Sequence, residues 1–302
     1  MIKVLANPVL ITGAKGQVGA ELVKLAPAGF TVIGLGSDQL DITNQQQVDA
    51  AVAEHQPSLI INAAAYTAVD KAESAAAQPF AVNEKGVACL AKAAQQAGIP
   101  LFHISTDYVF DGDGVFDGKA KIAYPETAVV NPQSVYGASK LAGEQALAAT
   151  HNKHIILRTS WIFGATGNNF VKTMLRLGKE RDELAVVADQ HGCPTSAASI
   201  AQVLWQLAKN YQQQGDLPWG IYNFSNFPAC TWHDFALEIF KQGKALGLLE
   251  KIPNVKAITT ADYPTPAKRP AWSVLDCKKI EAVLGHQVPD WKIELNQLLK
   301  NL

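Results

Sequence analysis

The sequence predicts an α/β fold in which a parallel sheet carries helices on both faces. Short apolar runs of the kind that form buried strands alternate with helical patterns, as in VLIT, TVIGL, SLIINAAA, PLFHIST and HIILRTS. This rhythm is typical of consecutive βαβ units. After Trp161 the chain becomes richer in Pro, Trp and Asn. We therefore predict a doubly wound parallel-sheet domain over residues 1–160 and a smaller, mixed lobe over residues 161–302, with some segments returning to the first domain.

The first predicted strand leads into a glycine-rich turn. The run NPVLITGAKGQVGAELVKLA reads as a strand, then Gly13, Gly16 and Gly19, then a helix. Glycine allows positive φ, close approach of a diphosphate and tight packing of helix on strand. The phosphates would rest on backbone N–H groups at the helix N-terminus, where the helix dipole favours negative charge. Because the triplet follows a strand and opens a helix, it predicts a dinucleotide site of the Rossmann type.

The end of the second strand bears on which dinucleotide binds. An acidic residue there usually holds the ribose 2′-hydroxyl and rejects a 2′-phosphate. Here strand 30–35 ends at Gly36, and Asp38 lies slightly beyond it. A role as a turn residue is at least as good an interpretation of Asp38 as a role in binding the ribose. Lys15 or Ser37 is available to a 2′-phosphate. The sequence therefore leaves open the choice between NADPH and NADH.

The residues that follow the later strands should meet at one edge of the sheet, because ligands of open α/β sheets bind outside the carboxyl ends of the strands. The three alanines at 63–65 would let the backbone approach a flat cofactor, or else would serve core packing. The next strand ends at Ser105, Thr106 and Asp107, where a hydroxyl can donate to a substrate carbonyl oxygen. His103, within that strand, is expected to be a buried histidine with satisfied hydrogen bonds.

Tyr136 and Lys140 lie four residues apart in the run NPQSVYGASKLAGEQALAAT. Side chains at i and i+4 of a helix are neighbours, with Cβ atoms roughly 5–6 Å apart. An ammonium group beside a phenol stabilises the phenolate, so we expect the pKa of Tyr136 to fall below its ordinary value of about 10. A helix that opens at residues 132–134 would add a contribution of the same sign. The pair predicts a proton donor, while the spacing alone also fits an exposed tyrosine beside a solvated lysine.

Composition excludes several classes of protein. With 302 residues, 48% hydrophobic content and a formal net charge of −1, the chain can bury a large core and has no electrostatic bias toward nucleic acid or anionic membranes. Its four cysteines lack paired spacing, which suits a reducing compartment and argues against a disulfide framework or a zinc site. We predict no metal site. The opening run MIKVLANPVLITG has no secretion leader, and we expect a cytoplasmic protein.

Six motifs occur in a characteristic order along the whole chain: TGAKGQVG, NAAAYTAVDKAE, STDYVF, YGASK, RTSWIFG and TPAKRPAWSVLD. With them the chain resembles the extended short-chain dehydrogenase/reductases and, within these, the dTDP-4-dehydrorhamnose reductase branch. The early motifs are shared by nucleotide-sugar enzymes across the superfamily. The block NAAAYTAVDKAE, the stretch GNNFVKTMLRL and the tail RPAWSVLD are narrower and point to the reductase branch.

The resemblance implies a reaction and a catalytic set. Enzymes of this branch use NADPH or NADH to reduce the C4 ketone of dTDP-4-dehydro-L-rhamnose to dTDP-L-rhamnose, a step of nucleotide-sugar biosynthesis for cell-surface polysaccharide. By this resemblance Tyr136 protonates the ketone oxygen, and Lys140 holds the nicotinamide ribose and lowers the phenol pKa. Thr106, at a position more often held by serine, polarises the carbonyl.

The resemblance also implies two sets of binding residues. Those expected to hold the cofactor are Gly13, Gly16, Gln17, Val18, Gly19, Asp41, Ile42, Ala63, Ala64, Ala65, Tyr66, Thr67, Tyr136 and Lys140. Those expected to hold the nucleotide sugar, mostly in the lobe over 161–302, are Thr106, Asp107, Trp161, Asn169 and Arg269. In the first set, residues 41 and 42 would flank the adenine. In the second, the tryptophan would close over the deoxysugar and the arginine would neutralise the diphosphate.

Two other functions remain compatible with the motifs. A nucleotide-sugar epimerase or dehydratase shares the tyrosine and lysine but retains its NAD through the cycle, and such enzymes commonly have a longer substrate lobe. A noncatalytic regulatory subunit of the type that partners methionine adenosyltransferase keeps much of the same fold. The intact set of Thr106, Tyr136 and Lys140 favours an enzyme. The oligomeric state, including a possible homodimer, is not fixed by the sequence.

Overall fold

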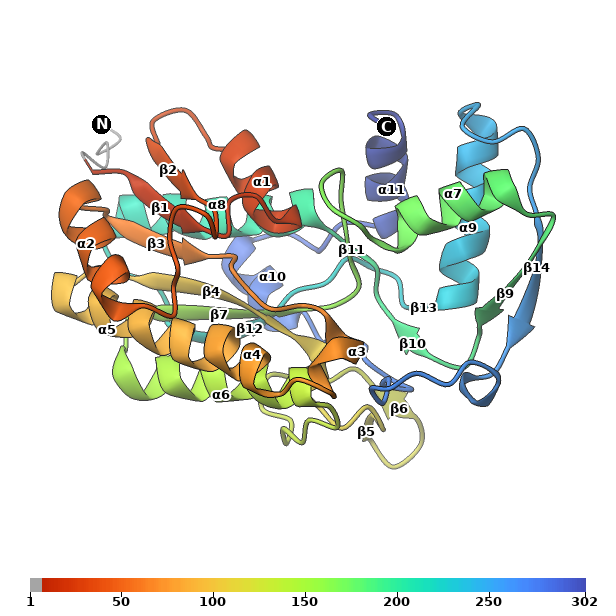
Figure 1. Ribbon diagram of the computed structural model, residues 1–302, viewed down its shortest axis with the longest axis horizontal. Helices are drawn as coiled ribbons and strands as arrows, with labels where there is room; N and C mark the ends of the chain where they lie inside the picture. The colour runs from red at the N-terminus through yellow and green to blue at the C-terminus, as the bar shows by residue number, and fades with distance from the viewer. Residues whose placement is uncertain (1–6) are drawn as a thin grey trace.

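A six-stranded parallel sheet forms the centre of the first lobe. The computed structural model describes residues 7–302 and shows two lobes side by side (Figure 1). The strand order is β12-β7-β4-β3-β1-β2, and every pairing is parallel. The strands are β1 (Val9–Thr12), β2 (Val32–Leu35), β3 (Leu59–Asn62), β4 (Leu101–Thr106), β7 (His154–Thr159) and β12 (Gly220–Asn223). The predicted α/β fold with a doubly wound parallel sheet is confirmed.

Helices cover both faces of this sheet (Figure 1). One face carries α1 (Gln17–Lys24) and α8 (Ala197–Gln214), and the other carries α2 (Gln45–His55), α5 (Val87–Ala97) and α6 (Val135–Thr150). Successive side chains of a strand point to opposite faces. Val9 and Ile11 of β1 therefore pack with the α1 and α8 side, while Leu10 packs with the α2 and α5 side. A strand buried on both faces reads as an unbroken apolar run, which is why Val9, Leu10 and Ile11 are all apolar.

Helix α6 packs unusually close to its neighbours. It begins at Val135, behind the N-cap Ser134, whose hydroxyl accepts from the N–H of Gly137 at 3.1 Å. A Cβ atom on Gly143 would lie 1.9 Å from the carbonyl oxygen of Asn83, in the π-helix η1 (Ala81–Gly86). The Asn83 amide also donates to Ser139 of α6 at 3.0 Å. This close approach buries the first two turns of α6 against β4.

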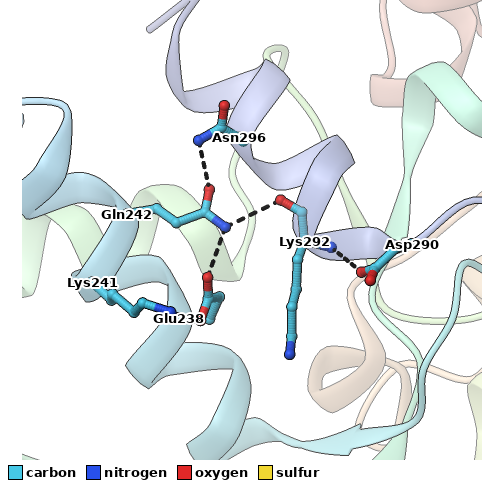
Figure 2. Close-up of polar contacts among 6 residues, drawn as sticks. All are labelled: Glu238, Lys241, Gln242, Asp290, Lys292 and Asn296. Atoms are coloured by element: carbon cyan, nitrogen blue, oxygen red, sulfur yellow. Dashed lines mark hydrogen bonds and ion pairs between the residues drawn. The ribbon is translucent and has the colours of Figure 1, made fainter.

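The second lobe has its own apolar core. It contains α7 (Phe170–Glu180), α9 (Trp232–Ala245), α11 (Trp291–Leu299) and the parallel pair β9 (Glu183–Val187) and β14 (Asn254–Ile258). Phe235, Phe240 and Trp291 are fully buried at its centre. Figure 2 shows how α9 and α11 are joined at their surface: the Gln242 amide donates to the Lys292 carbonyl at 3.1 Å and accepts from Asn296 at 3.2 Å.

Several segments of the second half of the chain return to the first lobe. Strand β12 pairs with β7 and completes the sheet. Helix α8 packs on α1, and its Trp205 indole donates to the carbonyl of Leu22 at 2.9 Å. The remaining elements are short: α3 (Val69–Ala72), α4 (Ala77–Phe80), η2 (Asp107–Val109), β5 (Val115–Phe116), β6 (Lys121–Ile122), β8 (Ile162–Phe163), β10 (His191–Gly192), β11 (Thr195–Ser196), β13 (Cys230–Thr231), η3 (Thr260–Asp262) and α10 (Lys278–Leu284).

No helix within residues 7–302 combines the length and apolar character needed to cross a bilayer. Nor do three or more His, Cys, Asp or Glu side chains of those residues gather into a group that could hold a metal ion. All four cysteines are free thiols.

Replacing Gly143 by alanine should destabilise the fold. The added methyl group would meet the Asn83 carbonyl oxygen at 1.9 Å. Because a backbone group cannot turn aside as a side chain can, we expect Gly143→Ala to lower the free energy of unfolding by about 1–3 kcal/mol. Urea unfolding followed by circular dichroism measures this change.

Gly243→Ala is the matched control. Gly243 is also a buried helical glycine, but a Cβ atom there would meet the flexible Leu175 side chain at 3.0 Å. Alanine is the better helix former, so this variant should stay close to the wild-type stability. Equal unfolding midpoints for the two variants would contradict the packing argument for α6.

Candidate active site

The glycine-rich turn and the alanine segment meet where the strand order reverses. Strand β1 lies between β2 and β3. The chain therefore places β2 on one side of β1 and then crosses over to place β3 on the opposite side. Ligands of doubly wound sheets bind at such a switch point. Gly13, directly after β1, has φ +69°, and a Cβ atom on it would lie 2.5 Å from the backbone nitrogen of Ala64, the second residue after β3. The structure thus brings the glycine-rich turn against the start of the alanine segment at 63–65.

The N-terminus of α1 is built to accept an anion. Its N-cap is Gly16, and no side chain caps the helix. The N–H groups of Gln17, Val18 and Gly19 lie in the first turn, where they have no acceptor within the helix. A Cβ atom on Gly19 would lie 2.1 Å from the Gly13 carbonyl oxygen, so the helix reaches this position only with glycine. These residues fit the diphosphate of a dinucleotide.

The other predicted cofactor residues differ in exposure. Asp41 is exposed, and its carboxylate accepts from the N–H of Thr43 at 2.9 Å. Ile42 is buried in the core beside α5, so of these two residues only Asp41 is accessible to a ligand. The N–H of Tyr66 donates to the Asn83 side chain at 2.9 Å, which fixes the segment after β3. Thr67, next in the chain, is exposed.

An exposed ion pair lies at the end of β2. The Lys15 ammonium donates to the Asp38 carboxylate at 2.6 Å, and this contact lowers the pKa of Asp38. A Cβ atom on Gly36 would lie 2.6 Å from Asp38 Oδ1 and 2.9 Å from the stem of Lys15. The glycine at the strand end therefore leaves room for both side chains.

The predicted catalytic residues are all buried and come from two adjoining elements. Thr106 ends β4, while Tyr136 and Lys140 lie in the first two turns of α6. The Thr106 hydroxyl donates to the Asp107 carboxylate at 3.0 Å. Burial raises the pKa of Tyr136, and hydrogen bonding with Thr106 opposes this rise. The structure thus places the threonine and tyrosine hydroxyls next to each other.

The predicted fall in the pKa of Tyr136 is wrong for this arrangement. Burial has the larger effect, and Lys140 is not among the groups that shift the phenol. The Lys140 amino group instead donates to the Ile104 carbonyl at 2.7 Å and lies 3.2 Å from the His103 imidazole. Tyr136 therefore keeps its proton at neutral pH, which is the state that a proton donor requires.

A large cleft opens beside this buried pair. Its volume is ≈ 1260 Å³, and its lining includes Asp70, Tyr108, Trp161 and Arg269. The Arg269 guanidinium pairs with Asp70 at 2.7 Å and donates to the Tyr108 hydroxyl at 3.2 Å. The Tyr108 ring meets the Tyr136 ring edge to face, with centroids 5.5 Å apart. Tyr108, in the lining of the cleft, is therefore also in contact with Tyr136.

The two remaining predicted substrate residues have different environments. Trp161 lies in the cleft, stacked on Trp232 with ring centroids 3.6 Å apart. Asn169 is the N-cap of α7, and its amide donates to the Gln17 side chain at 3.0 Å and to the Gly164 carbonyl at 2.7 Å. Asn169 therefore joins the second lobe to the diphosphate loop and is not part of the cleft lining.

Residues 7–302 match the family model described as the RmlD substrate binding domain. The chain belongs to this family. It is 49% identical over 295 residues to a dTDP-4-dehydrorhamnose reductase from Aggregatibacter actinomycetemcomitans, covering 97% of each chain. It is 39% identical over 298 residues to the protein of that name from Escherichia coli K12, again covering 97% of each. A crystal structure of dTDP-4-dehydrorhamnose reductase from Bacillus anthracis in complex with NADP superposes with a TM-score of 0.88, at 38% identity, over 98% of this chain and 99% of that one.

Sequence reasoning missed several residues of this RmlD-family site. Asp70 and Tyr108 lie inside the motifs NAAAYTAVDKAE and STDYVF, but nothing in their spacing singles them out. Ser273, in RPAWSVLD, is one of the groups that oppose the rise in the pKa of Asp107, and its hydroxyl donates to the His191 carbonyl at 3.4 Å. His103 is buried and hydrogen-bonded as predicted, yet its contact with Lys140 was not foreseen.

Asp107 should make the stability of this RmlD-family protein depend on pH. Burial raises the pKa of its carboxyl from 3.8 to about 6. A carboxyl with a raised folded-state pKa stabilises the fold while it is protonated, and this contribution is lost as pH rises from about 4 through 6. The Asp107→Asn side chain cannot ionise, so the variant does not lose this contribution. The free energy of unfolding of the variant minus that of the wild type should therefore be larger at pH 7 than at pH 4, by up to about 3 kcal/mol. Urea unfolding at the two pH values measures it, and an equal difference at both would contradict the assignment.

Proposed function

We propose that the chain is a dTDP-4-dehydrorhamnose reductase, which uses NADPH or NADH to reduce the C4 ketone of dTDP-4-dehydro-L-rhamnose to dTDP-L-rhamnose for cell-surface polysaccharide. The observation that carries the proposal is the buried pair of hydroxyls on Thr106 and Tyr136, between a diphosphate-binding turn and a cleft that contains an arginine. The names of the relatives support the choice of substrate.

Thr106 and Tyr136 would act on the same substrate oxygen. When bound, the reduced nicotinamide supplies a hydride to the sugar carbon. The threonine hydroxyl polarises the ketone, and the tyrosine phenol gives its proton to the oxygen as negative charge develops there. Because burial keeps the Tyr136 proton in place, it is transferred only to a strongly basic oxygen. The same burial excludes water from the reacting atoms.

The cleft provides groups suited to the nucleotide-sugar part of the substrate. The Arg269 guanidinium matches the geometry of a diphosphate, and its pairing with Asp70 fixes its direction. The exposed face of Trp161 offers an apolar surface to a deoxysugar.

We also place the enzyme in the cytoplasm, where its four free thiols stay reduced. A homodimer would show a mass of twice 32.4 kDa in light scattering.

Tyr136→Phe should abolish most of the reductase activity. Supplied with dTDP-4-dehydro-L-rhamnose, the wild-type protein should consume NADPH or NADH, measured by absorbance. Loss of a positioned general acid should lower kcat by about 10²–10⁴-fold. Tyr211→Phe is the matched control, since Tyr211 lies on α8 outside the cleft lining, and it should keep the wild-type rate.

The same assay separates the other two functions. Tightly bound NAD with no net consumption of reduced cofactor would indicate an epimerase or dehydratase. Failure to turn over with either cofactor would end the reductase proposal and favour a regulatory subunit.

Lys15→Ala should change the cofactor preference. We infer that Lys15 neutralises the 2′-phosphate of NADPH, while Asp38 accepts from the ribose hydroxyl of NADH. Loss of one charge-assisted contact should lower kcat/KM for NADPH about tenfold, equivalent to about 1.4 kcal/mol, and leave NADH nearly unaffected. Asp38→Asn should do the reverse. Equal losses for both cofactors in either variant would contradict this assignment.

A further inference from the structure

We propose that His103 is a positioning residue that favours the neutral amine form of Lys140, and thereby sets the pH at which this lysine changes its charge. His103 lies in the middle of β4, is fully buried, and places Nε2 3.2 Å from the Lys140 amino group. This inference rests on the proposed reduction, in which Lys140 would hold the nicotinamide ribose. It concerns the charge that the lysine carries there.

The hydrogen bonds around Asn62 determine the tautomer of His103. Asn62 Oδ1 accepts from the Thr12 hydroxyl at 2.7 Å and from the N–H of Ala64 at 3.0 Å. Because a backbone N–H can only donate, this oxygen cannot exchange places with the amide nitrogen. The Nδ2 group therefore donates to His103 Nδ1 at 2.9 Å. A neutral imidazole that accepts at Nδ1 carries its proton on Nε2.

The Nε2 proton points at Lys140. A neutral amine accepts this proton and still donates to the Ile104 carbonyl at 2.7 Å, so every polar group is satisfied. An ammonium has no lone pair, so it would face the Nε2–H as donor against donor. Protonated Lys140 thus loses either the contact to His103 or the contact between His103 and Asn62. Burial acts in the same direction and lowers the pKa of Lys140 to about 8.

The other charged groups around Lys140 do not supply a partner. Glu144, one turn further along α6, raises the pKa of Lys140 from a distance. Its carboxylate is held by Arg158 of β7 at 2.6 Å, and both side chains are almost fully buried. Tyr136, one turn before Lys140, stays uncharged at neutral pH because burial raises its pKa. Asp107, in η2, accepts from the Thr106 hydroxyl at 3.0 Å.

The consequence is a lysine whose charge changes close to neutral pH. When the Lys140 ammonium loses a proton to solvent, the Nε2–H of His103 stabilises the amine that remains. When the amine takes a proton from solvent, it loses the lone pair that accepts this contact. The ammonium, which offers more donors to a nicotinamide ribose, is therefore lost at a lower pH than in an ordinary lysine.

Carbon NMR of lysine measures this effect without any turnover. With ¹³C-labelled lysine, and Lys140→Arg to assign the signal, the Cε shift of Lys140 reports its titration. The amide of His103→Gln can turn its oxygen toward the ammonium, so we expect the midpoint to rise by about one pH unit. The basic limb of the pH profile for single-turnover reduction should move upward with it. A midpoint that stays the same or falls would overturn the proposal.

Thr12→Val is the control for loosened packing. It removes one buried hydrogen bond of the same chain of residues, while the N–H of Ala64 still fixes Asn62. The Lys140 midpoint should not move in this variant, and a shift equal to that of His103→Gln would count against a specific role for the imidazole.

A measurement on the wild-type protein covers the case in which His103→Gln does not fold. Ring ¹⁵N shifts should show His103 neutral and protonated at Nε2, and an Nδ1-protonated ring or an imidazolium would overturn the proposal. Absence of reductase activity together with the expected lysine and histidine shifts would refute the proposed function, but would leave the coupling of His103 to Lys140 standing.

Discussion

The close packing of α6 against its neighbours determines the protonation of Tyr136 and Lys140. The backbone of this helix lies against the Asn83 carbonyl at Gly143 and against the Tyr108 carbonyl at Gly137, where added Cβ atoms would lie 1.9 and 2.3 Å from the oxygens. At a normal packing distance Tyr136 and Lys140 would stand at the helix surface, in contact with water. Held this close, they lie within the protein, where burial governs their protonation.

Burial of charge on this scale has to be compensated nearby. Arg158 and Glu144 form an ion pair that is closed to solvent, and the guanidinium also lies over the ring of Phe110, 5.1 Å from its centroid. Pairs of this kind add little net stability, but removing one partner leaves an uncompensated charge and is strongly destabilising. The pair therefore locks α6 to β7. Among residues 7–302, Lys140 has no carboxylate at ion-pair distance, and burial lowers its pKa to about 8.

The local signals in the sequence were sufficient for the parallel sheet and for the glycine-rich turn between β1 and α1. Apolar runs, glycine spacing and the rule that ligands bind at the carboxyl edge are properties of short segments. The direction taken by Lys140 was not predictable in this way. It depends on His103, which is 37 positions away on another element, and on an amide orientation fixed by a third.

The same limit applies to Asn169. The resemblance implies that it lies near the substrate, and the structure adds that its side chain caps α7 and binds Gln17, 152 positions earlier. Such contacts arise only when two distant segments pack together.

The position of β12 has a consequence for biosynthesis. This strand, at residues 220–223, covers the outer edge of β7, and the helix before it shields the first face of the sheet. While the ribosome is still making the second half of the chain, β7 presents an unpaired row of amide and carbonyl groups, the kind of edge that recruits other chains. The nascent polypeptide must therefore remain protected from aggregation until residues 220–223 have been synthesised and have paired with β7.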